Sequence, residues 1–533
     1  MSHAVRLPCD EAAIQAHRAL APVRGAGPWV LAAAILGSSL AFIDGTVVTV
    51  ALPAIAREFS ARGSQVQWVV EAYALLLSAL LLVGGSMGDR FGRRRVYAWG
   101  VSLFTVASIA CGLASSISWL IVGRALQGVG GALLVPGALA LISASFGPEE
   151  RGRAIGTWSG FSGITAAIGP LVGGWLVGHS WRWAFFINVP MAAIVLVLLR
   201  KVPESRNPNA KRLDLMGAAL VTAGLGGLVY GLIESSEQGW GFAILAALAS
   251  GCVSLVAFVL WERRTVYPML PLSLFRSSNF IGANALTLFL YGALACVFFF
   301  LPLDLIQVHG YSPLQAGAAL LPFIAILFLF SRWSGGLVER FGARRPLLLG
   351  TTVAAAGFLL MSLPGGGGSY WTSFFPGIVV LGLGMAASIA PLTTAVMNAV
   401  GEENAGIASG VNNAVSRAAG LLSIALLGIL LAQVFDSELE RRIDSLSLQP
   451  GVHRQVLAER AKLAAAEPPP GIPPDQAASI RFEIQRAFVA GFQAVARASA
   501  LLSLGAAACA WAWIGREREL SAAESGPPRR DRR

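Results

Sequence analysis

The chain is poor in charge and almost free of lysine. Asp, Glu, Lys and Arg together make up 13% of its 533 residues, whereas 55% are hydrophobic and the mean hydropathy is +0.65. Charged residues are about 25% of an average soluble globular protein. This deficit excludes a water-soluble globular protein and indicates an integral membrane protein.

Residues that would support enzyme chemistry are also scarce or unsuitably spaced. A P-loop needs Gly directly before Lys, but Lys201, Lys211 and Lys462 follow Arg, Ala and Ala. The five Cys show neither metal spacing nor a paired framework, and the five His form no zinc motif. No G-x-S-x-G nucleophile elbow occurs. We therefore expect no enzyme activity, no metal and no cofactor.

Long apolar runs fill almost the whole chain. Their lengths are close to the ~20 residues that a helix needs to cross a bilayer, and their Gly and Pro content suits helices rather than barrel strands. We therefore expect an all-α integral membrane protein with fourteen spans. They lie at about 29–53, 66–88, 96–117, 120–146, 153–177, 183–199, 213–233, 240–261, 279–301, 312–338, 346–364, 371–396, 405–433 and 488–514.

The net charge is +11, and the positions of the basic residues indicate membrane topology rather than nucleic-acid binding. Most Lys and Arg lie in the two tails and in alternate loops, and only Arg57, Arg62 and Arg182 lie in the opposite short loops. By the positive-inside rule both termini are cytoplasmic, which requires an even number of spans. The polar segment 434–487 is an exception, because it carries basic residues on the outer side.

One loop sequence occurs twice. "GSMGDRFGRRR" (85–95) reappears as "GGLVERFGARR" (335–345), with the acid, Arg, Phe, Gly and two Arg in register. The copies follow spans 2 and 10, so two six-helix halves align only if spans 7 and 8 are an insertion. Parallel halves around a central cavity are the usual design of a carrier that rocks one half against the other.

This repeat divides the chain into five parts. We expect a cytoplasmic N-terminal tail (1–28), an N-terminal six-helix bundle (29–200), a two-helix insertion with flanking cytoplasmic linkers (201–278), a C-terminal six-helix bundle that includes the polar outer loop 434–487 (279–515), and a cytoplasmic C-terminal tail (516–533).

The repeated loop has the residues of a contact between the two bundles, which we call the latch. Gly permits a close turn, and a carboxylate at the helix end accepts hydrogen bonds from Arg or from a neighbouring helix N-terminus. The alternative interpretation is a set of charges that only fixes topology. The latch residues are Gly85, Asp89, Arg90, Gly92, Arg93, Arg94, Glu339, Arg340 and Gly342.

Three ionisable residues lie inside expected spans at similar depth. In "SLAFIDGTVVTVALP" (39–53), Asp44 lies about 13 Å inside the outer end of span 1, and Arg124 lies about 8 Å inside span 4. Glu71 lies one to two turns inside span 2. An unpartnered charge near the membrane centre costs about 2.5 to 3.5 kcal/mol, so such groups pair or face water. A carboxylate that alternates between a hydrated cavity and an apolar closed state can load and release a proton.

We therefore predict that Asp44 is the proton-coupling residue and that Arg124 is its partner. Glu71 is either a further proton-coupling residue or merely hydrated near the interface. A cationic substrate could compete for the same negative charge.

Span 5 contains a stretch suited to bending. Gly169-Pro170 interrupts the helix hydrogen bonds, and Gly173-Gly174 allow close approach of a neighbouring helix. A structural kink and a gating kink are both consistent with this pattern.

In span 13, Asn412, Asn413 and Arg417 can line a cavity. Spans 10 to 14 contain no obvious intramembrane Asp or Glu, which favours monovalent, zwitterionic or anionic cargo over dications. Arg417 is either a partner at a helix interface or a ligand contact.

Five motifs resemble those of the major facilitator superfamily, in the correct order. They are "IDGTVVTVALP" of span 1, "GSMGDRFGRRRVY" of the loop, "GRALQGVGGALLVPG" of span 4, "TAAIGPLVGG" of span 5 and "WRWAFFINVPMAA" of span 6. The chain departs from the usual patterns at Thr49 (Asn is common), Met87 (Leu is usual) and Thr165 (Gly is usual).

The resemblance is to the fourteen-helix drug:proton antiporter branch, and it implies two six-helix bundles plus two inserted central helices. It also implies proton-driven export, commonly of lipophilic cations or antibiotics. The basic residues are almost all Arg rather than Lys, which indicates a bacterial gene of high GC content. We therefore expect the protein in the bacterial cytoplasmic membrane.

We therefore expect a proton-coupled secondary exporter of small amphipathic or lipophilic compounds that works by alternating access. The alternatives are a dedicated exporter of one endogenous metabolite, an importer, or a non-transporting receptor or scaffold. A receptor needs an ordered domain, and 434–487 is too short and too broken by Pro to form one. The expected partners are a small molecule, protons and the bilayer, with no nucleic acid. We expect a functional monomer, and the sequence leaves open whether a periplasmic adaptor takes part.

Overall fold

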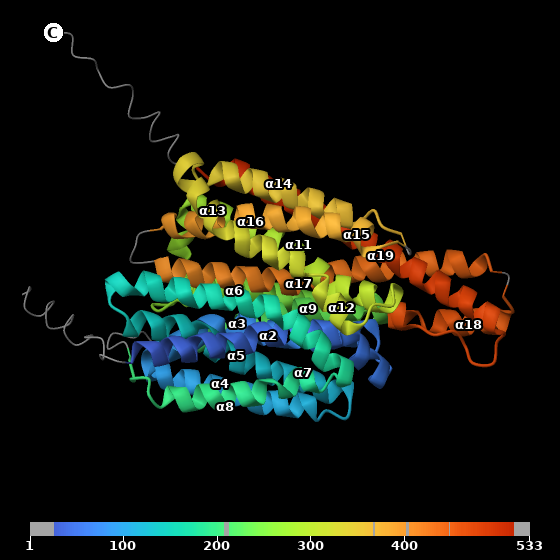
Figure 1. Cartoon of the computed structure of the whole chain (residues 1–533), viewed down its shortest axis with the longest axis horizontal. Helices are drawn as coiled ribbons and strands as arrows, with labels where there is room; N and C mark the ends of the chain where they lie inside the picture. The colour runs from blue at the N-terminus through green and yellow to red at the C-terminus, as the bar shows by residue number, and fades with distance from the viewer. Residues whose placement is uncertain (1–25, 207–212, 366–367, 401–404, 447, 516–533) are drawn as a thin grey trace, which may run out of the picture.

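The computed structural model describes residues 26–206, 213–365, 368–400, 405–446 and 448–515. Within these ranges the regular elements are all helices, most of them long and laid side by side along the longest axis of the molecule (Figure 1). The prediction of an all-α chain is therefore confirmed.

Seven helices form the N-terminal half. They are α2 (Gly27–Phe59), α3 (Gly63–Phe91), α4 (Arg93–Gly112), α5 (Ile117–Ser145), α6 (Pro148–His179), and the pair α7 (Trp183–Phe186) and α8 (Asn188–Leu199), which follow each other across one residue. Two helices follow, α9 (Leu215–Gln238) and α10 (Phe242–Arg264).

The C-terminal half begins after a short helix, η1 (Leu272–Arg276). Its elements are α11 (Ser278–Leu303), η2 (Asp304–Val308), α12 (Pro313–Ala318), α13 (Leu321–Phe341), α14 (Arg344–Met361), α15 (Tyr370–Ser373), α16 (Phe375–Asn398), α17 (Ala405–Asp444), α18 (Pro450–Ala458), η4 (Arg460–Ala465) and α19 (Pro474–Trp513).

Eleven helices of the described chain are long and apolar enough to cross a membrane, and Trp183–Leu199 is a shorter apolar helix. Large apolar side chains cover the outside of these helices, as lipid contact requires. Phe242, Val253 and Val256 on α10 are examples, with exposed fractions of 89%, 68% and 60%. The molecule therefore has the surface of a multi-pass membrane protein.

Small residues bring the helices together. A side chain on Gly84 of α3 would meet the backbone oxygen of Ala132 on α5 at 1.9 Å. A side chain on Gly384 of α16 would likewise meet the backbone nitrogen of Ala354 on α14 at 2.4 Å. Lipid tails are as apolar as the helix surfaces, so close backbone packing of this kind holds membrane helices together.

Helix α9 packs against one helix of each half, α3 and α17. Leu225, Val229 and Ile233 of α9 form a small buried cluster with Leu421 and Ala425 of α17. This insertion therefore covers the seam between the halves along α3 and α17.

Two glutamates fasten α9 to the start of α3. Glu234 accepts a hydrogen bond from the indole of Trp68 at 3.0 Å. Glu237 accepts one from the backbone nitrogen of Ser64 at 3.2 Å and pairs with Arg62 at 3.3 Å.

The two halves meet at the end of the molecule where α18 lies. Gly174 of α6 packs directly on the backbone of Leu314 in α12, and Gly428 of α17 packs on the side chain of Gln67 in α3. One continuous apolar core crosses this junction.

The polar segment 434–487 is largely helical rather than an open loop. It contains the last turns of α17, then α18 and η4, and the first turns of α19 (Figure 1). Arg442 of α17 pairs with Glu483 of α19 at 3.3 Å and holds the two helices together beyond the apolar spans. Helix α17 thus continues beyond the end of the apolar run 405–433, and α19 begins before the apolar run 488–514.

We predict that Gly84→Ala destabilises the protein by about 1 to 3 kcal/mol, because the new methyl group forces α3 and α5 apart. The midpoint of thermal unfolding in detergent measures this effect. Gly178→Ala is the control, because nothing lies within 4 Å of its added carbon and Ala favours the helix more than Gly does. Equal midpoints for the two variants would contradict the packing described.

Candidate functional site

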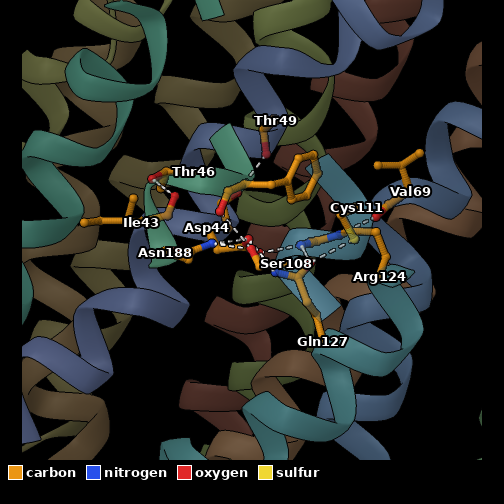
Figure 2. A network of polar contacts seen from close by, with 12 residues as sticks. Ile43, Asp44, Thr46, Thr49, Val69, Ser108, Cys111, Arg124, Gln127 and Asn188 are labelled. Atoms are coloured by element: carbon orange, nitrogen blue, oxygen red, sulfur yellow. Dashed lines mark hydrogen bonds and ion pairs between the residues drawn. The ribbon is translucent and has the colours of Figure 1, made fainter. Parts of the chain in front are cut away.

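Asp44 lies in the middle of α2, fully buried, and both of its carboxylate oxygens have donors. Nη1 of Arg124 lies 2.5 Å from Oδ2, and Nε2 of Gln127 donates to Oδ1 at 3.1 Å. Nδ2 of Asn188 also faces Oδ1, at 3.3 Å (Figure 2). Donors to both oxygens stabilise the ionised carboxylate.

Arg124 of α5 is equally buried, and its guanidinium is held on several sides. Besides the pair with Asp44, Nε donates to the backbone oxygen of Val69 at 2.9 Å, and Nη1 donates to Gln127 at 2.8 Å. The guanidinium carbon lies 4.4 Å from the ring centre of Tyr73, a cation–π contact. The fork of donors on Arg suits such a site, because one residue can bind several acceptors in fixed directions.

Ser108 of α4 closes the network. Its hydroxyl accepts from Gln127 at 3.1 Å and from Asn188 at 2.9 Å, and it donates to the backbone oxygen of Phe185 at 3.0 Å. Five transmembrane elements therefore contribute to one polar cluster inside the N-terminal half: α2, α3, α4, α5 and the junction of α7 with α8 (Figure 2). A buried network whose members have partners is rigid, and removing one member leaves others unpaired.

The structure separates Glu71 from the Asp44–Arg124 pair. Glu71 is fully buried in α3, and neither carboxylate oxygen has a hydrogen-bond partner. The prediction that Asp44 and Arg124 are neighbours agrees with this geometry, whereas Glu71 occupies a different environment.

The first copy of the latch is joined within the N-terminal half. Asp89 accepts two hydrogen bonds from Arg93, at 2.8 and 3.0 Å. Glu204 accepts from the backbone nitrogens of Arg94 and Arg95 at 3.0 and 3.1 Å. Gly92 adopts a φ of +107°, which only Gly adopts without strain.

The remaining latch residues are less constrained. Arg90 lies against the ring of Phe91, and Gly85 approaches Pro136 no closer than 3.6 Å. In the second copy, Gly342 also has a positive φ, of +70°, and Arg340 is exposed. The side chain of Glu339 lies outside the described part. The two glycines at equivalent positions thus make the same kind of turn.

Helix α6 runs unbroken from Pro148 to His179, and its glycines serve close packing. A side chain on Gly169 would meet Thr46 of α2 at 2.2 Å, and one on Gly173 would meet Val47 at 2.9 Å. Gly174 faces α12 instead. The side chain of Pro170 lies outside the described part.

The residues predicted for span 13 have three different environments. Asn412 donates to Thr287 at 2.7 Å and to Asn284 at 3.2 Å, both on α11, so it joins two helices of the C-terminal half. Asn413 is exposed and bonds only to its own helix. The Nε of Arg417 is buried without an acceptor.

A second buried ion pair lies near the end of α11. His309 Nδ1 is 3.3 Å from Asp304, and the two side chains are 6% and 2% exposed. Burial lowers the pKa of His309, but the hydrogen bond and charge of Asp304 together raise it above the usual value. Among the described residues no group of three or more His, Cys, Asp and Glu is arranged to hold a metal.

Sequence reasoning missed Gln127, Ser108 and Asn188. Gln127 follows Arg124 by three residues and so lies on the same helix face, a spacing that could have revealed it. Ser108 and Asn188 have no comparable signal, because only the fold brings α4 and α8 next to α2.

Comparison with known proteins agrees with this fold. The family model described as Major Facilitator Superfamily matches residues 34–424. The chain is 40% identical over 433 residues to the multidrug resistance protein Stp of Mycobacterium tuberculosis, covering 80% of this chain and 79% of the relative. It is 35% identical over 511 residues to the tetracenomycin C resistance and export protein of Streptomyces glaucescens, covering 94% of each.

Solved structures with low sequence identity share the fold. A bacterial homolog of the human lysosomal transporter Spinster matches with a TM-score of 0.60 at 20% identity, over 91% of this chain and 97% of that one. The xylose transporter XylE of E. coli matches with a TM-score of 0.55 at 14% identity, over 91% and 96%. The family-model match over most of the chain and the two relatives together show that the chain belongs to the Major Facilitator Superfamily.

Proposed function

We propose that the protein is a proton-coupled exporter of small amphipathic or lipophilic compounds, a drug:proton antiporter of the bacterial cytoplasmic membrane. The names of its relatives support export and resistance as the role. The observation that carries the proton part is the buried pair of Asp44 and Arg124, because ionisable groups inside membrane helices are costly to bury and mark proton or substrate pathways by default.

The pair offers a simple means of coupling. In the described state Asp44 is bound by Arg124. Uptake of a proton by Asp44 removes its charge and frees the guanidinium to seek another acceptor. Protonation of Asp44 can thereby change the free-energy difference between the two conformations of the carrier. A cationic cargo can replace the proton as the partner of Asp44.

The proposal includes an orientation. The chain crosses the membrane fourteen times with both termini in the cytoplasm, so the end with α18 is the outer side. Three of these spans each consist of two consecutive helices, namely α7–α8, α12–α13 and α15–α16. The two six-helix bundles, 29–200 and 279–515, rock about the insertion 201–278.

The latch and the glycines of α6 take part in this rocking. Asp89 is held by Arg93 in the described state. In the other state it would accept hydrogen bonds from the C-terminal half and hold the cytoplasmic side closed. Gly169 and Gly173 let α6 slide along α2 without a side chain in the way.

The C-terminal half supplies the cargo contacts in this proposal. Arg417 is a half-buried cation whose Nε is buried without an acceptor, and Asn413 is an exposed amide one turn away on the same helix. A positive charge at this position disfavours dications and favours monovalent, zwitterionic or anionic cargo. A dedicated exporter of one endogenous metabolite fits the same geometry, because these residues do not distinguish an exporter of one compound from an exporter of many.

The remaining partners follow from this role. The exporter acts as a monomer in the bilayer and exchanges protons for a small molecule, without nucleic acid. A non-transporting receptor or scaffold is disfavoured, because the segment 434–487 extends two membrane helices instead of forming a separate domain.

We predict that Asp44→Asn abolishes substrate-induced proton release from energised inside-out vesicles. Asn cannot take up a proton, and removing one partner of a buried ion pair costs about 3 to 5 kcal/mol. Glu58→Gln is the matched control, because Glu58 lies on the same helix but forms a partly exposed pair with Arg182. Proton release at the wild-type level in Asp44→Asn would refute the assignment.

The orientation predicts which loops can be labelled from outside. Single cysteines at Gly241, Gly451 and Arg206 are placed in a variant whose native Cys are replaced by Ser. A membrane-impermeant maleimide should label Gly241→Cys and Gly451→Cys in intact cells, and Arg206→Cys only after permeabilisation. The reverse pattern at any of the three positions would overturn the topology.

The charge preference predicts discrimination between two dyes with the same ring system. Ethidium carries one positive charge and propidium carries two, so we expect export of ethidium and little export of propidium. Replacing Arg417 with Gln should reduce this discrimination. Efficient propidium export by the wild-type protein would contradict the proposed role of Arg417.

A further inference from the structure

Glu71 is a buried carboxyl group without any partner. Its exposed fraction is 0%, and neither Oε1 nor Oε2 has a hydrogen-bond partner. Asp44 is just as deeply buried, but it is surrounded by Arg124, Gln127 and Asn188. The two carboxyl groups of the N-terminal half therefore have opposite environments in one and the same conformation.

The position of Glu71 is the seam between the two halves. Gln67 lies one helical turn away on the same face of α3, and its side chain packs directly on Gly428 of α17. Helix α3 packs along α17, which belongs to the C-terminal half, so relative movement of the halves changes the surroundings of this face of α3 and of Glu71.

No cation among the described residues neutralises Glu71. Arg124 of α5 is committed to Asp44 and to the backbone of Val69. Arg417 of α17 makes no hydrogen bond to Glu71, because neither oxygen of Glu71 has a partner. Lys462 of η4 pairs with its own neighbour Glu459.

An ionised carboxylate in such a place would have lost its hydration without gaining a donor or a counter-charge. Burial of this kind strongly favours the neutral, protonated form of a carboxyl group. Ionisation of Glu71 is therefore strongly disfavoured in the described state.

A small cavity lies beside Gln67, one helical turn from Glu71 toward the outer side. Gln67 lines this cavity together with Phe300 and Gln307 of the C-terminal half. Leu463 of η4 forms another wall, and its side chain reaches Gly63 at the start of α3. Leu463 is one of two non-Gly residues with a positive φ in the described chain. The η4 segment thus closes the outer end of the seam directly above Gln67.

We propose that Glu71 is a second proton-binding site of the transport cycle, separate from Asp44. It takes a proton from the outer side when the seam between α3 and the C-terminal half opens, keeps it while it is buried as in the described state, and gives it up in a later step in which water reaches it from the cytoplasmic side. No bond other than the O–H bond is made or broken. Each cycle then carries two protons, one on Asp44 and one on Glu71. This proposal rests on the proton-coupled export proposed above.

The protonation state is tested by infrared spectroscopy of the purified protein at neutral pH. A protonated carboxylic acid has a carbonyl stretching band that a carboxylate lacks. We expect this band in the wild type and in Asp44→Asn, and we expect Glu71→Gln to lose one such band. If Glu71→Gln loses only a carboxylate band, Glu71 is ionised and the proposal is wrong.

The stoichiometry is tested in proteoliposomes by measuring proton flux and ethidium flux together. We expect about two protons per ethidium for the wild type and about one for Glu71→Gln, which keeps the shape of a protonated glutamic acid. Glu262→Gln is the matched control, because Glu262 is a buried glutamate of α10, away from the seam, and should keep the wild-type ratio.

The outcomes separate the two proposals. A wild type that exports ethidium without any proton flux defeats the proposed function itself. A wild type that moves about one proton per ethidium, or a Glu71→Gln ratio equal to the wild-type ratio, defeats only the second site. The wild-type ratio alone decides the question if Glu71→Gln does not fold.

Discussion

A charged group inside a membrane protein has to be matched by another group, and the Asp44–Arg124 pair shows how much structure this requires. The carboxylate is on α2 and the guanidinium on α5. Gln127 and Asn188 fill the remaining acceptor positions, and Ser108 connects them to α4. These elements are thereby fixed relative to one another, so the N-terminal half can move as one rigid body. A rigid half is what a rocking carrier needs.

Much of this fold could be predicted from the sequence, because membrane helices have strong local signals. Long apolar runs located the helices, and the repeated loop showed that the chain has two related halves and an insertion. The depth of Asp44 and Arg124 in their helices, together with the cost of an unpaired charge, was enough to suggest the pair. Gln127 could have been found from its spacing to Arg124. Asn188 could not, because its role depends on a helix that pairs with α2 only in three dimensions.

The parts that sequence reasoning described least well lie where local signals compete. The polar composition of 434–487 suggested a loop, yet most of its described residues are helical, in the ends of α17 and α19 and in α18 and η4, and the pair of Arg442 with Glu483 joins α17 to α19 there. The motif of α6 suggested a kink, yet the helix is continuous, and its glycines serve contact with α2 and α12. The close approach expected at Gly173-Gly174 is present in the structure, but the helices they contact could not be named from the sequence, because α2 and α12 are remote from α6 along the chain.

The contrast between Asp44 and Glu71 follows from which neighbours each one has. Asp44 faces its own half, and its donors in α5 and α8 belong to the same half, so movement of the two halves against each other does not by itself remove them. Glu71 faces the other half, so its surroundings are remade whenever the halves move. A group in fixed surroundings changes its protonation only when something binds to it, whereas a group at a moving seam changes its protonation because of the movement itself. Two carboxyl groups placed in this way respond to different steps of one cycle: one to the arrival of cargo, the other to the change of access.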